Sequence, residues 1–269
     1  MAAAVQNPEA PQLIEETEDF AVVYKPPRIH CVPLRAGEGG TLLAWYARLF
    51  PPAAALRGKR PLEGGILHRL DYETQGLVLF GKTQSALEKL FIQQEEGRFV
   101  KEYGAISHKA GPSPSLPGFP PAPALPGSGP FCIRSYFRSY GPGGKTVRPL
   151  TGLNRPGKKT ASDRGRPYET EIVETADWGE EFRRFTLRIK RGFRHQIRCH
   201  LAWLGNPIRG DPLYGPAGND TAPPGEGAIN PPEGPLALRA QGLFFFDPQN
   251  GKPREYRIPS LTGIRQFEP

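Results

Sequence analysis

The sequence is poor in cysteine and has no long hydrophobic run. Its three cysteines (Cys31, Cys132 and Cys199) are scattered, and no two of them have Cys-x-x-Cys spacing. We therefore expect free thiols in a reducing compartment rather than a disulfide framework. No apolar stretch approaches the roughly 20 residues of a membrane-spanning helix. The first residues also lack the basic and apolar regions of a secretory signal. These absences favour a cytoplasmic protein with no membrane partner.

Positive charge is in excess. The 269 residues include 35 Lys and Arg against 27 Asp and Glu, which gives a net charge of +8 and a pI near 9.5. Such a balance favours a polyanionic partner. Hydrophobic residues make up 38% of the chain, which is enough for a packed core and excludes global disorder.

Hydrophobic patterns and capping residues predict an α+β fold, with a mixed, largely antiparallel β-sheet core and flanking helices. Alternating or apolar runs predict strands, and cap residues followed by glycine or proline stops predict helices. The strands are expected over 20–24, 77–80, 99–106, 168–173, 185–189, 236–246 and 254–258, and the helices over 41–50, 85–97 and 194–204.

Three Pro/Gly-rich insertions interrupt these elements, near 107–131, 141–166 and 216–235. The second carries seven basic residues against one acid, which suits a mobile loop along a phosphate backbone. A merely solvated loop explains that charge equally well. With no repeat and no clear boundary in view, we expect a short N-terminal extension (1–19) and a single domain over 20–269.

The segment around Asp71 holds the first candidate for chemistry. His68-Arg69-Leu70-Asp71 lies just before an apolar strand, at a turn with nearby glycines. An aspartate in such a place can be a general base, a metal ligand or a nucleophile that attacks electron-poor carbon. A turn-capping carboxylate bonded to the backbone is the alternative, and the residues alone do not exclude it.

The segment 191–200 is the second candidate. Arg194 and Arg198 are four residues apart, so on a helix they would share a face and could hold a carboxylate or phosphate. A solvated basic face is the alternative. His195 and Cys199 have helical spacing too, but no further ligand pattern supports zinc, so we expect no metal. His200 is expected to be packed or hydrogen-bonded rather than a base.

Lys101 and Tyr103 form the third candidate. They lie two apart on an expected strand and therefore share a face. Tyr103 could stack on a flipped base, although a core tyrosine is the alternative.

Together, these segments resemble the RluA-type pseudouridine synthase family. The resemblance runs from about Phe20 to Ile258, and three ordered blocks are more specific than one short match. The matching residues are Val22-Val23-Tyr24-Lys25-Pro26, His68-Arg69-Leu70-Asp71 with Thr74 and Gly76-Leu77, Lys101-x-Tyr103, His195-Gln196-Ile197-Arg198-x-His200-Leu201, Gly205, Pro207-Ile208, Gly210-Asp211, Tyr214-Gly215 and Leu236-Ala237-Leu238-x-Ala240.

The chain departs from the family pattern at three places. Gln75 stands where a serine is usual, Phe193 replaces a common arginine, and Arg28 occupies a position that is often glycine. These departures affect RNA contacts and target choice rather than the reaction. About 20 residues precede the first family strand, which we expect to be too few for an S4 RNA-binding domain.

The resemblance implies an isomerase that converts uridine to pseudouridine in structured rRNA or tRNA. It gives Asp71 the role of nucleophile or of base in glycal formation, and pairs Arg198 with Asp71. Tyr103 would stack on the uracil, and Arg69 would fill the gap left by the flipped base. Further RNA contacts are expected from His68, Lys101, Arg194 and His195. No cofactor is expected, and the expected state is a monomer bound to an RNA stem-loop.

Two other classes of protein remain as alternatives. A non-catalytic RNA-binding protein or RNA chaperone would use the same basic loop and aromatics. A nucleoside or glycoside hydrolase would need a second carboxylate opposite Asp71, and Glu73 is only two residues away.

Overall fold

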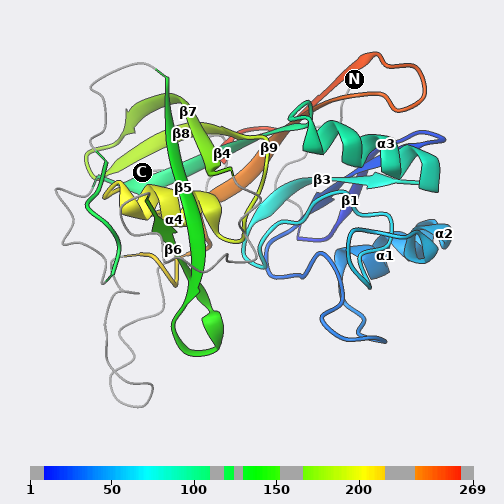
Figure 1. Ribbon diagram of the computed structural model, residues 1–269, viewed down its shortest axis with the longest axis horizontal. Helices are drawn as coiled ribbons and strands as arrows, with labels where there is room; N and C mark the ends of the chain where they lie inside the picture. Colours follow the sequence, from blue (N-terminus) through cyan, green and yellow to red (C-terminus); the bar gives the residue numbers. More distant parts are fainter. Residues whose placement is uncertain (1–8, 110–117, 124–129, 152–165, 216–233, 262–269) are drawn as a thin grey trace. The chain divides into compact units, whose positions relative to one another are not determined.

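The computed structural model describes residues 9–109, 118–123, 130–151, 166–215 and 234–261, which form two compact units (Figure 1). The first unit comprises residues 1–102 and 239–264, and the second comprises residues 103–238 and 265–269. The chain crosses between them within strand β4 (Val100–His108) and returns at the start of β9 (Leu238–Phe246). No helix among the described residues is long and apolar enough to span a membrane.

The first unit is built on a mixed sheet. Its strand order is β1 (Gln12–Glu16), β2 (Phe20–Lys25), β3 (Gln75–Gly81), then β9, which also pairs with β10 (Pro253–Arg257). The β3–β9 pair is parallel, and the β1–β2, β2–β3 and β9–β10 pairs are antiparallel. Every residue of β2 and β3 is buried, as expected of central strands covered on both faces.

Helices cover both faces of this sheet (Figure 1). On one face, Val22 of β2 packs in a cluster with Leu87 and Leu90 of α3 (Gln84–Glu95). On the other face, Phe80 of β3 meets Tyr46 of α1 (Leu42–Leu49), with ring centroids 4.7 Å apart. The short α2 (Pro52–Ala55) follows α1. Since neighbouring strand residues point to opposite faces, one apolar strand can serve both cores.

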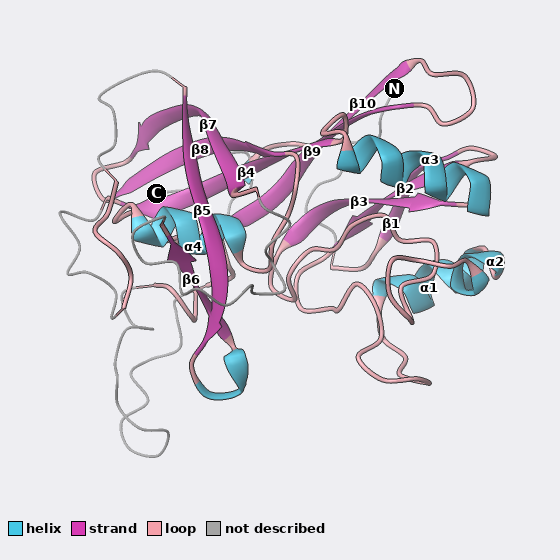
Figure 2. Cartoon of the chain, in the orientation of Figure 1, coloured by secondary structure: helices cyan, strands magenta, loops and turns pink. Residues whose placement is uncertain are grey.

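The second unit has strand order β4, β8 (Phe182–Ile189), β7 (Tyr168–Trp178), β5 (Phe131–Tyr140) and β6 (Thr146–Leu150). The pairs β8–β7, β7–β5 and β5–β6 are antiparallel. The turn η1 (Pro142–Gly144) lies at the tip of the β5–β6 hairpin (Figure 2). Phe137 and Val147 of the hairpin pack against Cys199 and Ala202 of helix α4 (Gln196–Trp203).

The predicted α+β class with a mixed, largely antiparallel sheet is confirmed. All the expected strands and helices occur, with shifted ends. Thr41 caps α1 by accepting a hydrogen bond from the Ala44 amide, as its position predicts. The cap of α3 is Thr83 rather than Ser85, since the Thr83 side chain accepts the bond from the Ala86 amide.

Other expectations were wrong in part. The segment 1–19 is not only an extension, because it contains β1. The segment 141–166 is not one mobile loop, because η1 and β6 form a hairpin with β5; residues 152–165 lie outside the described residues. The insertion near 216–235 lies almost wholly outside them as well. The structure divides the chain into two compact units, and the expectation that residues 20–269 form a single domain stays a prediction.

Candidate active site

Asp71 lies in a loop, residues 68–74, that leads into β3 and is held along its length by hydrogen bonds. The Leu70 amide donates to Sγ of the buried Cys31 at 3.2 Å. The Thr74 amide donates to the Asp71 carbonyl at 3.1 Å and closes the turn. The Asp71 side chain is partly exposed. This Asp71 loop therefore presents a carboxylate to solvent from a fixed backbone.

A buried ammonium group lies against the Asp71 loop. Lys25, the last residue of β2, donates from Nζ to the carbonyls of Pro26 at 2.9 Å and Tyr72 at 3.2 Å. Burial lowers the pKa of Lys25 to about 8, and the nearby Cys31 and the carboxylates of Asp71 and Glu73 act in the opposite direction. Lys25 thus both fixes the Tyr72 carbonyl and supplies positive charge next to Asp71.

The carbonyl of Tyr72 has a second donor. The Arg28 amide reaches it at 2.8 Å, with Arg28 in the left-handed region at φ 63°. One donor from the end of β2 and one from the segment after it therefore converge on one carbonyl of the Asp71 loop. Sequence reasoning missed both contacts, although Lys25-Pro26 and Arg28 were noted as family positions.

Arg69, the residue predicted to fill the gap left by a flipped base, is at the surface. Its side chain is 46% exposed, and Nη1 lies 3.5 Å from a carboxylate oxygen of Glu63. An exposed arginine with one long ion pair can change partner at low cost. This geometry is compatible with the predicted role, which stays a prediction.

His68 and Lys101, both predicted to contact RNA, are buried together around Phe99. Nε2 of His68 accepts a hydrogen bond from the Leu79 amide at 3.3 Å. Burial, with the Lys101 ammonium nearby, holds the pKa of His68 well below its usual range. Burial also lowers the pKa of Lys101 to about 7, with Lys59 adding to the effect. These positions favour a packing role, and RNA contact by either residue stays a prediction.

Gln75, one of the departures from the family pattern, is fully buried at the start of β3. Its Oε1 accepts a hydrogen bond from the Tyr24 hydroxyl at 2.6 Å. Burial raises the pKa of Tyr24 to about 12, while the nearby Arg239 acts in the opposite direction. The Tyr24 hydroxyl therefore remains a donor at neutral pH and satisfies Oε1 of Gln75, whereas the buried Nε2 of Gln75 has no hydrogen-bond partner among the described residues.

Arg198 is held in the second unit by a buried ion pair. Its Nε and Nη2 each donate to one carboxylate oxygen of Asp211 at 2.8 Å, and both side chains are 0% exposed. This side-on geometry fixes the plane of the guanidinium. Asp211 had been noted only as part of the family pattern. A buried arginine needs a carboxylate partner, and that requirement could have identified it.

Asp211 also shapes the turn that follows it. Its Oδ1 accepts from the amides of Leu213 at 2.9 Å and Tyr214 at 3.1 Å. The Tyr214 hydroxyl in turn accepts from the Val147 amide at 2.7 Å and lies 3.2 Å from Nδ1 of His195. One hydrogen-bonded assembly therefore joins Arg198, the 211–214 turn and His195, which precedes α4.

The expectation that Arg194 and Arg198 share a helix face was wrong. Helix α4 begins at Gln196, after His195 turns the backbone through the left-handed region at φ 55°. Arg194 is exposed and donates to the carbonyls of Gly144 and Thr146 at the hairpin tip. Helix α4 is also buried on every side, not only along the predicted apolar stripe.

His200 is a buried hydrogen-bonded residue, as predicted. Its Nε2 lies 2.9 Å from the Ser135 hydroxyl and its Nδ1 lies 2.8 Å from the Thr170 hydroxyl. Burial lowers the pKa of His200 to about 3, so the ring is neutral at physiological pH. Full burial separates this pair of Ser135 and His200 from any substrate.

The predicted catalytic residues fall in different units. Asp71 belongs to the first unit, whereas the buried Tyr103 and Arg198 belong to the second. The partnership of Arg198 with Asp71 and the stacking role of Tyr103 stay predictions. Among the described residues, no group of three or more His, Cys, Asp or Glu side chains could hold a metal ion.

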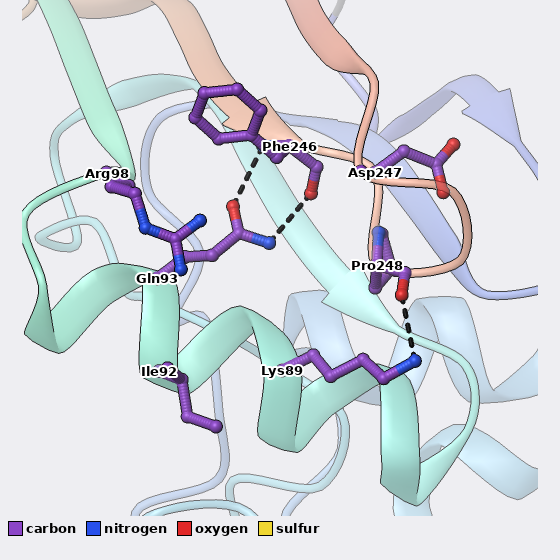
Figure 3. A pocket seen from close by; sticks show the side chains of 8 residues that line it. Lys89, Ile92, Gln93, Arg98, Phe246, Asp247 and Pro248 are labelled. Carbon is purple, nitrogen blue, oxygen red and sulfur yellow. Dashed lines mark hydrogen bonds between the residues drawn. The ribbon is translucent and has the colours of Figure 1, made fainter.

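A surface pocket in the first unit lies between α3 and the β9–β10 turn (Figure 3). Gln93 of α3 exchanges two hydrogen bonds of 2.8 Å with the Phe246 backbone, and Lys89 donates to the Pro248 carbonyl at 3.0 Å. These polar groups already bond each other and join the helix to the turn. The pocket is therefore structural, and none of the predicted site residues lines it.

Comparison with known proteins gives a family and a shared fold. Residues 19–203 match the family described as RNA pseudouridylate synthase. The ribosomal large subunit pseudouridine synthase D of Haemophilus ducreyi is 29% identical over 209 residues, which are 76% of this chain and 52% of that protein. The protein of the same name from Escherichia coli is 27% identical over 266 residues, which are 92% of this chain and 66% of that protein. The chain thus spans between half and two thirds of these relatives.

Two solved human structures have the same fold at low identity. Human RNA pseudouridylate synthase domain containing 1 gives a TM-score of 0.61 at 20% identity, over 95% of this chain and 86% of that chain. Human RNA pseudouridylate synthase domain containing 4 gives 0.56 at 20% identity, over 94% and 90% of the two chains. At this level of identity, the likeness concerns the fold alone.

Proposed function

The chain belongs to the RNA pseudouridylate synthase family, and from that membership we propose that it isomerises uridine to pseudouridine in structured RNA, with Asp71 as the reacting carboxylate. The observation that supports this most directly is the position of Asp71. It is partly exposed, on a loop fixed by hydrogen bonds, next to the buried ammonium of Lys25. Lys25 thus places a positive charge close to the carboxylate.

The reaction needs no redox step and no external group. The N1–C1′ bond of uridine breaks, the uracil turns, and a C5–C1′ bond forms. C5 then loses its proton to solvent, and N1 gains one. Asp71 acts either by attacking C1′ or by removing the proton that starts glycal formation. Both routes need a carboxylate with a fixed orientation toward the substrate. The hydrogen bonds that hold the backbone of the Asp71 loop favour such an orientation.

The proposal also includes roles for Arg69, Arg198 and Tyr103. Exposure of Arg69 supports its role in filling the space left by a flipped base. Asp211 binds the Arg198 guanidinium side-on and fixes its orientation, which supports a role for Arg198 in the reaction. Tyr103 is proposed to stack on the uracil, by resemblance alone. The relatives bear the name of a ribosomal synthase, which makes rRNA the first substrate to test.

The test is release of tritium from RNA labelled at uracil C5, since only C5–C1′ bond formation expels that atom. Purified protein should release tritium from unmodified rRNA. Asp71→Asn should reduce release to background while binding of RNA and the fold persist. The matched control is Glu73→Gln, which removes a carboxylate two residues away and should keep activity.

Other outcomes identify the alternatives. Binding of RNA without tritium release by the wild-type protein would indicate a non-catalytic RNA-binding protein. Release of free uracil would indicate a hydrolase. Substantial tritium release by Asp71→Asn would remove Asp71 from the mechanism.

A further inference from the structure

Arg28 has an unfavourable backbone conformation next to the Asp71 loop. Its φ of 63° lies in the left-handed region, which costs a non-glycine residue free energy because Cβ crowds the carbonyl. Glycine would adopt this conformation without strain. This chain nevertheless keeps a long charged side chain at the position. Residues held in such conformations cluster where a protein binds or reacts.

The Arg28 side chain is exposed and available to a partner. Among the residues that the structure describes, no carboxylate forms a salt bridge with its guanidinium. Its backbone, by contrast, is anchored, because its amide donates to the Tyr72 carbonyl at 2.8 Å. The Arg28 side chain therefore starts from an anchored backbone beside Tyr72, the residue that follows Asp71.

Tyr72 provides an aromatic surface at the same place. Tyr72 follows Asp71 directly in the chain. It is 42% exposed and is therefore not part of the core. Its ring lies 4.7 Å from the ring of His30, tilted by 41°. The backbone of His30 is also fixed, since its carbonyl accepts from the Leu42 amide at 2.9 Å. The two rings thus form a platform that needs little ordering when a ligand binds.

We propose that Arg28, His30 and Tyr72 form a surface that binds the single-stranded nucleotides flanking the target uridine. An unpaired base stacks on the Tyr72–His30 platform, because every base offers a π-face to an aromatic side chain. The Arg28 guanidinium contacts a neighbouring phosphate. The proposal rests on the proposed function, because continuity with Asp71 is what identifies the partner as RNA.

The first test uses Arg28→Gly, for which the proposal predicts opposite changes in two properties. Glycine relieves the left-handed strain, so the midpoint of denaturant unfolding should stay the same or rise. Loss of one charged phosphate contact should weaken binding of a short RNA hairpin about tenfold. It should also reduce the slope of log K against log salt by about 0.7 to 0.9. Arg48→Gln, which removes an exposed charge from α1 in the same unit, is the control for net charge.

The second test concerns the platform. Tyr72→Ala should weaken hairpin binding about tenfold through loss of base stacking, whereas Tyr72→Phe keeps the ring and should bind like the wild type. Circular dichroism and unfolding midpoints confirm that each variant is folded. In the tritium assay, both Arg28→Gly and Tyr72→Ala should raise KM more than they lower kcat.

Binding and turnover separate the two proposals. If the wild type releases tritium but both variants bind and turn over like Arg48→Gln, the surface does not hold RNA, although the proposed function stands. If the wild type binds RNA through Arg28 and Tyr72 but releases no tritium, the surface stands and the proposed function fails. If the wild type binds no RNA, both fail.

Discussion

The buried pair of Arg198 and Asp211 makes a quantitative prediction about stability. In Asp211→Asn, the side-chain oxygen can still accept the amides of Leu213 and Tyr214. The new NH2 group, however, faces the Nε–H of Arg198, where Oδ2 now accepts at 2.8 Å. Two donors then oppose each other, and a fully buried guanidinium loses its counter-charge.

The expected cost follows from that burial. Removing one partner of a buried ion pair destabilises a protein by about 3–5 kcal/mol, because the remaining charge is left uncompensated. In a chain of this size, such a change corresponds to a fall in melting temperature on the order of 10 °C. We therefore expect Asp211→Asn to be among the most destabilising isosteric changes in the second unit.

Asp247 provides a matched control. It also accepts two backbone amides in a turn, those of Gln249 and Asn250, and it binds Nε and Nη2 of Arg254 at 3.0 and 2.7 Å. The side chain of Arg254 is 36% exposed, so water can solvate it when its partner is lost. Asp247→Asn should therefore cost only about 1 kcal/mol.

Equilibrium urea unfolding, followed by circular dichroism, measures both variants. The reasoning fails if Asp211→Asn destabilises the protein no more than Asp247→Asn does. It fails as well if Asp211→Leu, which removes the carboxylate entirely, is as stable as the wild type, since the buried cation would then tolerate a wholly apolar neighbour.

Three further predictions concern other parts of the molecule. His200 has a pKa of about 3 in the fold against about 6.5 when unfolded, so the unfolded chain binds more protons between these values. Urea unfolding should then show a loss of about 2 kcal/mol from pH 7 to pH 5, and His200→Gln should lose less. Tyr24→Phe and Gln75→Ser should show a coupling of roughly 0.5–1.5 kcal/mol in a double-mutant cycle, and additive effects would contradict their hydrogen bond. Arg138 and Arg148 are opposed on the β5–β6 hairpin, so Arg138→Glu should stabilise the protein by a few tenths of a kcal/mol and weaken RNA binding measured by fluorescence anisotropy. Unchanged RNA affinity would mean that the hairpin makes no contact.

Short-range patterns predicted the elements around the Asp71 loop. The apolar runs of β2 and β3, the Thr41 cap and the turn before β3 all depend on neighbouring residues, and the structure has each of them. The start of α3 shows the limit of this reasoning. Thr83 and Ser85 can both cap a helix, and in the structure it is the Thr83 side chain that accepts a hydrogen bond from the Ala86 amide.

Contacts between residues distant in sequence could not be predicted from local patterns. The hydrogen bonds of Lys25 and Arg28 to the Tyr72 carbonyl join segments more than 40 residues apart. The β5–β6 hairpin was missed because its glycine-rich turn resembles a loop by composition. Arg194 was misplaced for a related reason. Helical spacing placed it on α4, but the left-handed turn at His195 excludes it from the helix.

The strained residues can be compared with the site residues that the family resemblance implies. Among the described residues, three non-glycine residues have positive φ: Arg28, Leu62 and His195. Each belongs to a segment that is connected to a residue with a proposed role. Arg28 bonds to Tyr72 in the Asp71 loop, Leu62 precedes the glutamate that pairs with Arg69, and His195 precedes the helix that carries the buried arginine. Left-handed conformations cost free energy and persist only where the surrounding structure enforces them. Substitution by glycine should therefore raise or preserve stability at each position while lowering activity, and the reverse pattern at all three would mean that the strain serves the fold alone.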